Sequence, residues 1–399
     1  MSIITIDLET YYDKEYSLSK LTTEEYVRSE KFQLIGGCIK RDTEAAVWYT
    51  GKSFIDAVSG IDFSNEAILC HNTAFDGSIL SWCYDINPKM WLDTLSMARP
   101  KHLRTTGCSL DALSKHYNIG HKGREVHDMR GKRLQDFSQA ELSHYADYCI
   151  NDTELTRKLF DELIKGFPRQ ELITIDQVLR MFTEPTFELD RMVLDTRLAE
   201  IRLEKQHLMD TLGDASSEEG RNAIRATLMS NEKFATLLHE HGIEPPTKIS
   251  PRTGKTAYAF SKTDEAFLEL REHSDSFVVA AVTARLGVKS TLEETRCESF
   301  IGISQRTPEG KLPILLNYAG AHTSRFSGGD GINLQNLNRG GALRRALKAP
   351  KGYVVIASDL SQIEARLLSY VSGQDDLVEA FAQGRDIYSE FATDVYDRT

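Results

Sequence analysis

Two patterns meet in the stretch Tyr353-Val-Val-Ile-Ala-Ser-Asp359-Leu-Ser-Gln-Ile-Glu364-Ala-Arg366-Leu-Leu-Ser-Tyr370. The β-branched run from Val354 to Ile356 predicts a buried strand, and apolar residues at helical spacing from Ile363 predict a helix after it. Asp359 stands at the end of that strand, where burial disfavours its charge unless a cation compensates it. The pattern is typical of a divalent-cation ligand in a site that handles phosphates. A simpler role, in which Asp359 caps the helix, fits the same residues.

This stretch resembles the first palm motif of the family A, polymerase I-like DNA polymerases, through the eight residues from Asp359 to Arg366. In that family the Asp is a metal ligand and the Glu excludes a 2′-hydroxyl. The resemblance therefore implies these roles for Asp359 and Glu364. It also implies that Gln362 contacts DNA or nucleotide.

Three segments upstream resemble the same family, namely Thr323-Ser-Arg325-Phe-Ser327, Asn333-Leu-Gln335-Asn336 and Leu343-Arg344-Arg345-Ala-Leu. The resemblance implies that Arg325 contacts the minor groove at the primer terminus, where acceptors common to every base pair are presented. It places Gln335 and Asn336 among the DNA contacts. Arg344 would lie near the incoming triphosphate, because a forked, permanently charged guanidinium suits phosphate oxygens.

The family requires two further motifs after this point: a fingers helix with Arg and Lys for the triphosphate, and a His-Asp-Glu turn with the second palm carboxylate. Neither occurs among the 29 residues between Tyr370 and the end of the chain at Thr399. With one of two palm acids absent, two-metal nucleotidyl transfer should fail. We therefore expect an incomplete polymerase site that needs a separate C-terminal fragment and accepts deoxynucleoside triphosphate only when completed. The sequence leaves open whether the chain is a natural split subunit or a truncation.

Charge is unevenly distributed along the 399 residues, whose formal net charge is −11. Residues 99–133 hold nine Lys or Arg against three acids, Asp111, Glu125 and Asp128. Residues 245–262 hold four with no acid, and residues 322–351 hold six against Asp330 alone. Local basic surface, rather than a basic total, is what nucleic-acid binding needs. The stretch 99–133 could flank a single strand, or it could be an ordinary solvated loop.

Composition indicates a chain of two to three domains with ordinary cores, since 41% of its residues are hydrophobic. The six cysteines contain no C-x-x-C pair, which favours free thiols in a reducing compartment. We find no apolar run of membrane-spanning length and no room for a signal peptide. The expected location is the cytoplasm, or the host cytoplasm if the chain is phage-encoded, with no membrane partner.

The N-terminal strand pattern Ile3-Ile-Thr-Ile-Asp7-Leu-Glu9-Thr places Asp7 and Glu9 on one face. Two like charges on one face are tolerable on an exposed edge strand or around a metal. Further strands are predicted at 34–39 and 45–49, which would complete a β-meander. A short buried strand at 67–70 then leads into a helix that carries Asp76.

The capping-box spacing Ser138-Gln-Ala-Glu141 predicts the start of a helix. On it, Tyr148 and Asp152 are four residues apart and share a face. Alone, such a pair is more often a hydrogen bond on a helix surface than a catalytic device.

Taken in order, D-x-E at Asp7 and Glu9, His71-Asn72-x-x-Phe75-Asp76, and Y-x-x-x-D at Tyr148 and Asp152 resemble the proofreading 3′–5′ exonuclease family, a ribonuclease H-like fold. The resemblance implies two Mg²⁺ or Mn²⁺ ions held by four acids. These acids are Asp7, Glu9, Asp76 and Asp152. It implies that Tyr148 orients or deprotonates the attacking water and that Asn72 and Phe75 contact the 3′ end of single-stranded DNA.

Helices are predicted from Glu188 through Leu212 and around 231–238, before a turn-rich basic segment at 245–262 with Gly254 at its tip. This region resembles the thumb of the polymerase family, which implies sequence-independent phosphate contacts. The resemblance assigns such contacts to Lys233, Arg252 and Lys255. A generic helical connector is the alternative.

The interpretation is an α/β chain in three parts: a ribonuclease H-like exonuclease domain with a mixed sheet and helices at 1–168, a mainly helical connector and thumb-like region at 169–305, and a partial α+β polymerase palm at 306–399. Its predicted function is that of the N-terminal part of a phage-like or bacterial family A DNA polymerase that binds primer-template DNA and proofreads. Two alternatives stay open. One is a stand-alone exonuclease whose C-terminal region holds DNA, and the other is a non-catalytic DNA-binding subunit.

Overall fold

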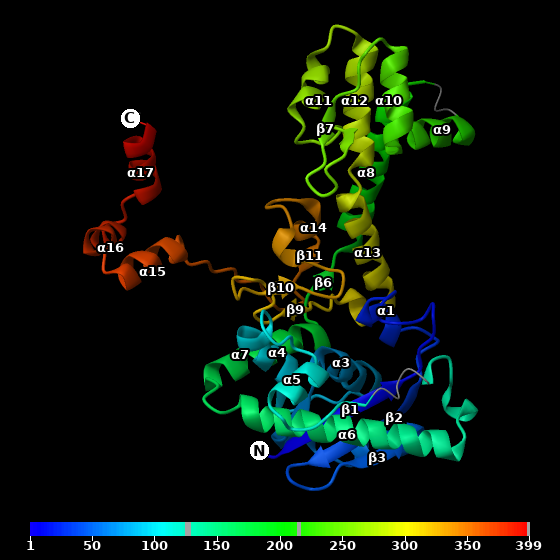
Figure 1. Cartoon of the computed structure of the whole chain (residues 1–399), viewed down its shortest axis with the longest axis vertical. Coiled ribbons are helices and arrows are strands. Elements are labelled where there is room, and N and C mark those ends of the chain that lie inside the picture. Colours follow the sequence, from blue (N-terminus) through cyan, green and yellow to red (C-terminus); the bar gives the residue numbers. More distant parts are fainter. Residues whose placement is uncertain (124–128, 214–216, 397–399) are drawn as a thin grey trace. The chain divides into compact units, whose positions relative to one another are not determined.

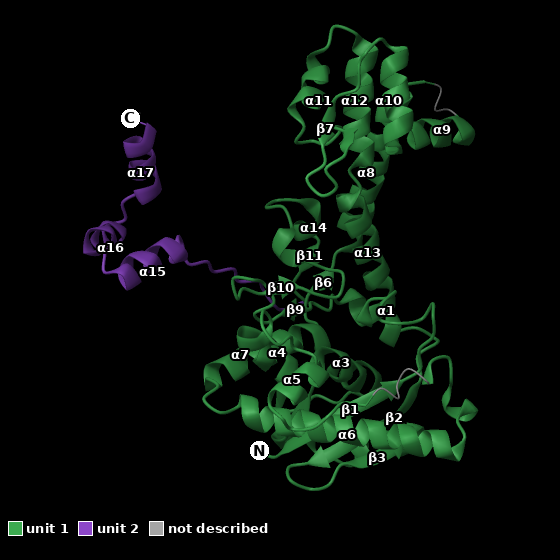
Figure 2. Cartoon of the chain, in the orientation of Figure 1, with its two compact units in different colours: residues 1–350 green, residues 351–399 purple. Residues whose placement is uncertain are grey.

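The computed structural model describes residues 1–123, 129–213 and 217–396, and these form two compact units, 1–350 and 351–399 (Figure 2). The acids Glu125 and Asp128 of the basic stretch lie outside the described residues. In the described part of the chain, no helix is long and apolar enough to cross a membrane.

The first unit begins with a mixed five-stranded sheet in the order β3-β2-β1-β4-β5. Figure 1 labels β1, β2 and β3 of this sheet. Its strands are β1 (Ile3–Thr10), β2 (Leu34–Arg41), β3 (Val47–Thr50), β4 (Ala67–Cys70) and β5 (Met90–Asp93). The pairs β1–β2 and β2–β3 are antiparallel, whereas β1–β4 and β4–β5 are parallel. The predicted meander and the buried fourth strand are thus confirmed, and β1 lies at the centre of the sheet.

Helices surround this sheet: α1 (Thr23–Val27), α2 (Gly51–Ser59), α3 (Thr73–Tyr84), α4 (Thr94–His102), α5 (Leu110–His116), α6 (Gln139–Leu163) and α7 (Arg169–Thr183). The 25-residue α6 begins with the predicted capping box: Ser138 accepts from the Glu141 amide, and Glu141 accepts from the Ser138 amide. Buried side chains of β1, β4, α3, α6 and α7 form one hydrophobic core. Short 3-10 turns occur at Phe63–Asn65 and Leu134–Asp136.

The chain then forms a helical region with α8 (Arg191–Asp210), α9 (Glu218–Met229), α10 (Asn231–Glu240), α11 (Glu265–Glu269), α12 (Ser276–Lys289) and α13 (Leu292–Arg306). The predicted helices at 188–212 and 231–238 correspond to α8 and α10. However, Glu188 and Leu189 form β6, because they pair with β11 instead of opening the helix. The basic segment forms a hairpin of β7 (Thr247–Ile249) and β8 (Thr256–Tyr258), with Gly254 at φ +66° near its tip.

Short ladders follow: β9 (Leu316–Asn317) pairs with β10 (Ser327–Gly328), and β11 (Leu347–Lys348) follows α14 (Ala342–Arg345). Further 3-10 turns lie at Leu270–Glu272, Pro308–Gly310 and Leu334–Asn336. Two contacts join this region to α1. Asp330 accepts from the Thr23 and Glu24 amides at 2.5 and 3.3 Å, and Arg306 Nη2 lies 2.6 Å from the buried Glu24 carboxylate.

The second unit contains α15 (Ile363–Ser372), α16 (Asp375–Ala382) and α17 (Ile387–Tyr396). The predicted helix after Asp359 is confirmed, but the strand predicted before it is wrong, because residues 353–360 pair with no neighbouring strand in the described chain. Val354 and Ile356 are 80% and 86% exposed. Phe381 of α16 is 6% exposed, and the Arg366 guanidinium lies 4.8 Å from the centre of its ring.

Candidate metal-binding active site

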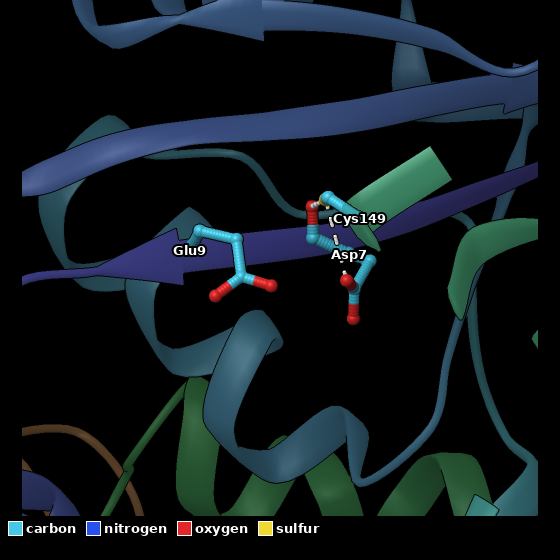
Figure 3. Close-up of side chains that lie close together, drawn as sticks. All are labelled: Asp7, Glu9 and Cys149. Atoms are coloured by element: carbon cyan, nitrogen blue, oxygen red, sulfur yellow. Dashed lines mark hydrogen bonds between the residues drawn. The ribbon is translucent and has the colours of Figure 1, made fainter. Parts of the chain in front are cut away.

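Two acids on the central strand β1 form the base of the site. Ile4, Ile6 and Leu8 enter the hydrophobic core, so the alternation of the strand turns Asp7 and Glu9 together to the other face. Their carboxylates point to the same side of β1 in Figure 3. The edge-strand alternative is therefore wrong, since β1 has a hydrogen-bonded neighbour on each side.

The first turn of α3 supplies the third acid. Asp76 is buried, and its Oδ1 accepts from the backbone amide of Leu8 at 3.1 Å, which ties it to the strand that carries the other two acids. Asn72 enters α3 in the left-handed conformation, with φ 73°. Asp93 holds this turn by accepting from the Asn72 and Thr73 amides at 2.9 and 3.1 Å.

One face of α6 packs against the acids of β1 and contributes further side chains to the site. Residues at helical spacing, Tyr145, Tyr148, Cys149 and Asp152, are all buried there. Tyr145 donates its hydroxyl to Glu9 at 2.6 Å. The Cys149 thiol lies 3.3 Å from Asp7 Oδ2 and 3.4 Å from the Asp7 carbonyl oxygen (Figure 3). The ligand atoms of Asp7, Glu9 and Cys149 lie within 4.8 Å of one another.

Lys122 brings a positive charge to this group. Its ammonium forms an ion pair with Asp152 and lies 4.9 Å from the centre of the Tyr148 ring. Beside this pair a cavity of about 660 Å³ is lined by Lys122 and Tyr148 together with polar side chains of α6, including Ser143, His144 and Asn151. The site therefore has a polar recess large enough for part of a nucleic-acid strand next to the acids.

Burial and mutual repulsion raise the pKa values of the acids Asp7, Glu9 and Asp76. Burial, and then the charge of Asp152, raises the pKa of Asp7 from 3.8 to about 7, although Lys122 opposes the shift. Burial and the charge of Asp7 likewise raise the pKa values of Glu9 and Asp76 well above their ordinary range. Four carboxylates held together in this way strongly favour any cation that reaches them.

Tyr148 is a poor proton acceptor and a good hydrogen-bond donor in this setting. Burial, and then the neighbouring Asp152 charge, raises the pKa of its hydroxyl far above 10. The phenol therefore stays protonated at neutral pH. Of the two roles predicted for Tyr148, this favours orienting a water molecule over deprotonating it.

The donor set suits hard divalent cations. Asp7, Glu9, Asp76 and Asp152 offer carboxylate oxygens from β1, α3 and α6 to one region, and oxygen is the ligand that Mg²⁺ and Mn²⁺ prefer. Glu9, Asp76 and Asp152 are buried, and Lys122 is the described cation paired with Asp152. Such a site fits bound cations that balance the remaining negative charge.

The other predicted exonuclease contacts flank the α3 entry. Asn72 is exposed, whereas Phe75 is partly buried with its ring centre 5.9 Å from that of Tyr26. In the helical region, Lys233, Arg252 and Lys255 are all exposed, the last two at the hairpin tip. Their surface positions leave them accessible to a strand.

The predicted polymerase residues fall in both units. Arg325, Gln335, Asn336 and Arg344 are exposed side chains of the first unit. Asp359, Gln362 and Glu364 belong to the second unit, where Asp359 and Glu364 are exposed and Gln362 precedes α15 with φ 55°. The two groups therefore belong to different compact units.

Three residues of the site were missed by the sequence analysis: Lys122, Tyr145 and Cys149. The last two lie seven and three positions before Asp152, on the same helical face, so this spacing was an available signal. Lys122 had no such signal, because only its membership of a basic stretch was visible in the sequence.

Comparison with known proteins points to one family. A family model described as DNA polymerase family A matches residues 197–399. The chain is 27% identical over 308 residues to DNA polymerase I of Pseudomonas aeruginosa, covering 72% of this chain and 31% of that one. It is 24% identical over 405 residues to DNA polymerase I of Borreliella burgdorferi, covering 98% and 41%. It is 38% identical over 252 residues to a thermostable DNA polymerase I of Thermus thermophilus, covering 60% and 28%.

These matches span between 28% and 41% of the relatives' own length. Among solved structures, the chain resembles the POL domain of Pol1 from M. smegmatis, in complex with DNA primer-template and dNTP, with a TM-score of 0.60. That match has 16% sequence identity and covers 98% of this chain and 63% of the solved one, so it is evidence for the fold.

Proposed function

The chain belongs to DNA polymerase family A, and from this premise we propose that it is the N-terminal part of such a polymerase and carries a metal-dependent 3′–5′ exonuclease. The convergence of Asp7, Glu9, Asp76 and Asp152 from β1, α3 and α6 is the observation that carries this proposal. The strand order of the sheet also suits a ribonuclease H-like domain, which we assign to residues 1–168.

The proposed reaction is hydrolysis of the terminal phosphodiester of single-stranded DNA. Two Mg²⁺ or Mn²⁺ ions bound by the four acids would lower the pKa of water and neutralise charge at the phosphate. The protein's own groups position the reactants. Tyr145 fixes Glu9, the Leu8 amide fixes Asp76, and Tyr148 offers a protonated hydroxyl to orient the attacking water. The 660 Å³ cavity beside Tyr148 would receive the 3′ end.

The test compares the chain with its Asp7→Ala variant on a 5′-labelled single strand in Mg²⁺. We expect products that shorten one nucleotide at a time from the 3′ end, and a loss of at least about a hundredfold in the variant. Asp56→Ala, which removes an exposed acid of α2, is the matched control and should retain the rate. Undiminished digestion by Asp7→Ala would show that the metal assignment is wrong.

The family match over residues 197–399 supports a polymerase role for the chain beyond the exonuclease domain. Here we assign residues 169–305 to a connector and thumb-like region and residues 306–399 to a partial palm. Lys233, Arg252 and Lys255 would contact DNA phosphates through exposed cations. In the partial palm, Asp359 would be a metal ligand, and the other predicted palm contacts would bind primer-template or nucleotide.

We further propose that polymerisation needs a separate fragment with the fingers and the second palm acid. The exposed apolar side chains at 353–356 and on α15 support this, because such surface is normally covered. Primer extension should be absent for residues 1–399 alone, appear when the fragment is added, and be lost again in Asp359→Ala. Extension by this chain alone would refute the proposal. Failure of the two to associate, with exonuclease activity intact, would favour the stand-alone exonuclease.

A further inference from the structure

A basic cavity of the helical region is lined by residues of the β7–β8 hairpin, α10, α12 and the start of α13. Its volume is about 490 Å³, within the range of small-ligand sites. The cations lining it are Lys248, Lys262, Arg285 and Lys289, and the acid among the lining residues is Asp264. Asp264 pairs with Lys248 at 2.5 Å, so three positive charges of the cavity lack an acid there.

Arg285 is the unusual member of this group because its side chain is fully buried and forms no ion pair with a described carboxylate, although the charge of Glu232 acts on it. Its Nη1 donates to the carbonyl oxygens of Leu228 and Ser230, and its Nη2 donates to Asn231 Oδ1. Its Nε has no hydrogen-bond partner among the described residues. A buried donor of this kind is costly unless something accepts from it.

A helix terminus adds to the positive potential. The 15-residue helix α13 starts at the cavity, where Thr291 and Leu292 line the wall, and Thr291 makes no side-chain cap. The free amides of a helix N-terminus favour anions. The first-turn acids Glu293 and Glu294 pair instead with Arg197 and Lys205 of α8, at 3.0 and 2.5 Å.

An aromatic surface completes the cavity. Tyr258 and Phe260 point to the same side of the chain and stack with their ring centres 5.2 Å apart and their planes within 3°. Phe260 is buried, whereas Tyr258 is partly exposed and lines the cavity. A partly exposed ring beside several cations suits a ligand that combines a planar base with a phosphate.

We propose that this cavity binds a nucleoside phosphate, with its phosphate at Lys262, Arg285, Lys289 and the start of α13 and its base against Tyr258. The ligand is either a free nucleotide or one nucleotide of a single strand. This site is distinct from the hairpin-tip residues Arg252 and Lys255, which do not line the cavity. It also does not depend on the exonuclease, so either proposal can fail without the other.

Two positive charges, those of Lys289 and Arg285, lie close together in the cavity, which also supports a bound phosphate there. Lys289 Nζ donates to Asn231 Oδ1 at 3.2 Å and faces the Arg285 guanidinium. Burial, and then the charge of Arg285, lowers the pKa of Lys289. A bound phosphate would relieve this repulsion, because it places negative charge between the two cations.

The test is calorimetric titration of the full chain with deoxyadenosine 5′-monophosphate in EDTA, which prevents metal-dependent binding at the carboxylates. Parallel arms use inorganic phosphate, deoxyadenosine and a short oligothymidylate. Binding should weaken roughly tenfold to a hundredfold in Lys289→Gln and in Lys262→Gln, since each loses one charge-assisted contact. The exposed Lys52→Gln of α2 is the control and should bind as the wild type does.

Arg285 is left unchanged because it also holds the end of α9. The two lysine variants should keep the melting temperature of the wild type. Binding of oligothymidylate alone, lost in both variants, would identify the ligand as part of a strand. Equal binding of deoxyadenosine and its monophosphate, or binding of both phosphate ligands unchanged in the two variants, would overturn the proposal, as would no binding in any arm.

Discussion

Replacing Asp7 with Asn should stabilise the metal-free chain at alkaline pH. In the folded state, burial and the charge of Asp152 raise the pKa of Asp7 from 3.8 to about 7. An acid whose folded pKa is raised contributes stability that is fully present below the unfolded pKa of about 4 and is lost as pH rises through about 7. At pH 8 the ionised Asp7 therefore destabilises the folded chain, and the neutral amide does not.

The size of the effect follows from the shift. About 3 pKa units correspond to about 4 kcal/mol at pH 8, as an upper value, because water and nearby side chains relax around a buried charge. For a domain of this size each kcal/mol moves the melting temperature by about 2–4 °C. Asp7→Asn should thus melt several degrees above the wild type at pH 8 in EDTA, and the difference should almost vanish at pH 4.

The assay is thermal denaturation followed by circular dichroism, with Asp56→Asn as the control for removing an exposed acid. Added Mg²⁺ should raise the melting temperature of the wild type at pH 8 and have much less effect on Asp7→Asn, since a ligand stabilises the state that binds it. A variant that is less stable than the wild type at pH 8, or a difference that does not change with pH, would refute the electrostatic account of this site.

Other substitutions test separate features of the structure. Lys122→Met removes the cation beside the buried acids and should destabilise the metal-free chain by about 3–5 kcal/mol in urea titrations at pH 8; an unchanged midpoint would contradict the ion pair. Arg306→Met should cost about 1–3 kcal/mol, because the buried Glu24 would lose its closest cation and keep the longer ion pair with Arg28 at 3.6 Å, and adding Glu24→Gln should recover part of the loss; simple additivity of the two changes would exclude this coupling. Gly36→Ala should cost about 1–3 kcal/mol, because its methyl would lie 2.4 Å from an indole carbon of β3; wild-type stability in guanidinium titrations would show that the indole can move.

Much of the first domain could be predicted because its signals are local. Alternation along β1 placed Asp7 and Glu9 together, and the capping box fixed the start of α6. The position of Lys122 could not be predicted, since it depends on a tertiary contact between a loop and α6. The spacing of Tyr145 and Cys149 indicated their helical face, but not that Asp7 and Glu9 would lie opposite it.

The error at residues 353–356 has a different cause. β-branched composition indicates that a segment can pack in a sheet, but a strand forms only when another strand supplies its hydrogen bonds. In the described chain no strand pairs with it.

The contact between Asp330 and the start of α1 can form only late in translation, after residue 330 has been synthesised. The Thr23 amide and the Asp330 carboxylate are 307 positions apart in the sequence. At about 5–20 residues per second, a ribosome needs roughly 15–60 s to add the second partner after the first. During that interval the five-residue α1 lacks this partner for its first amides, and a helix so short is marginal by itself. The nascent domain would therefore expose this corner to proteases and chaperones until residue 330 has left the ribosome.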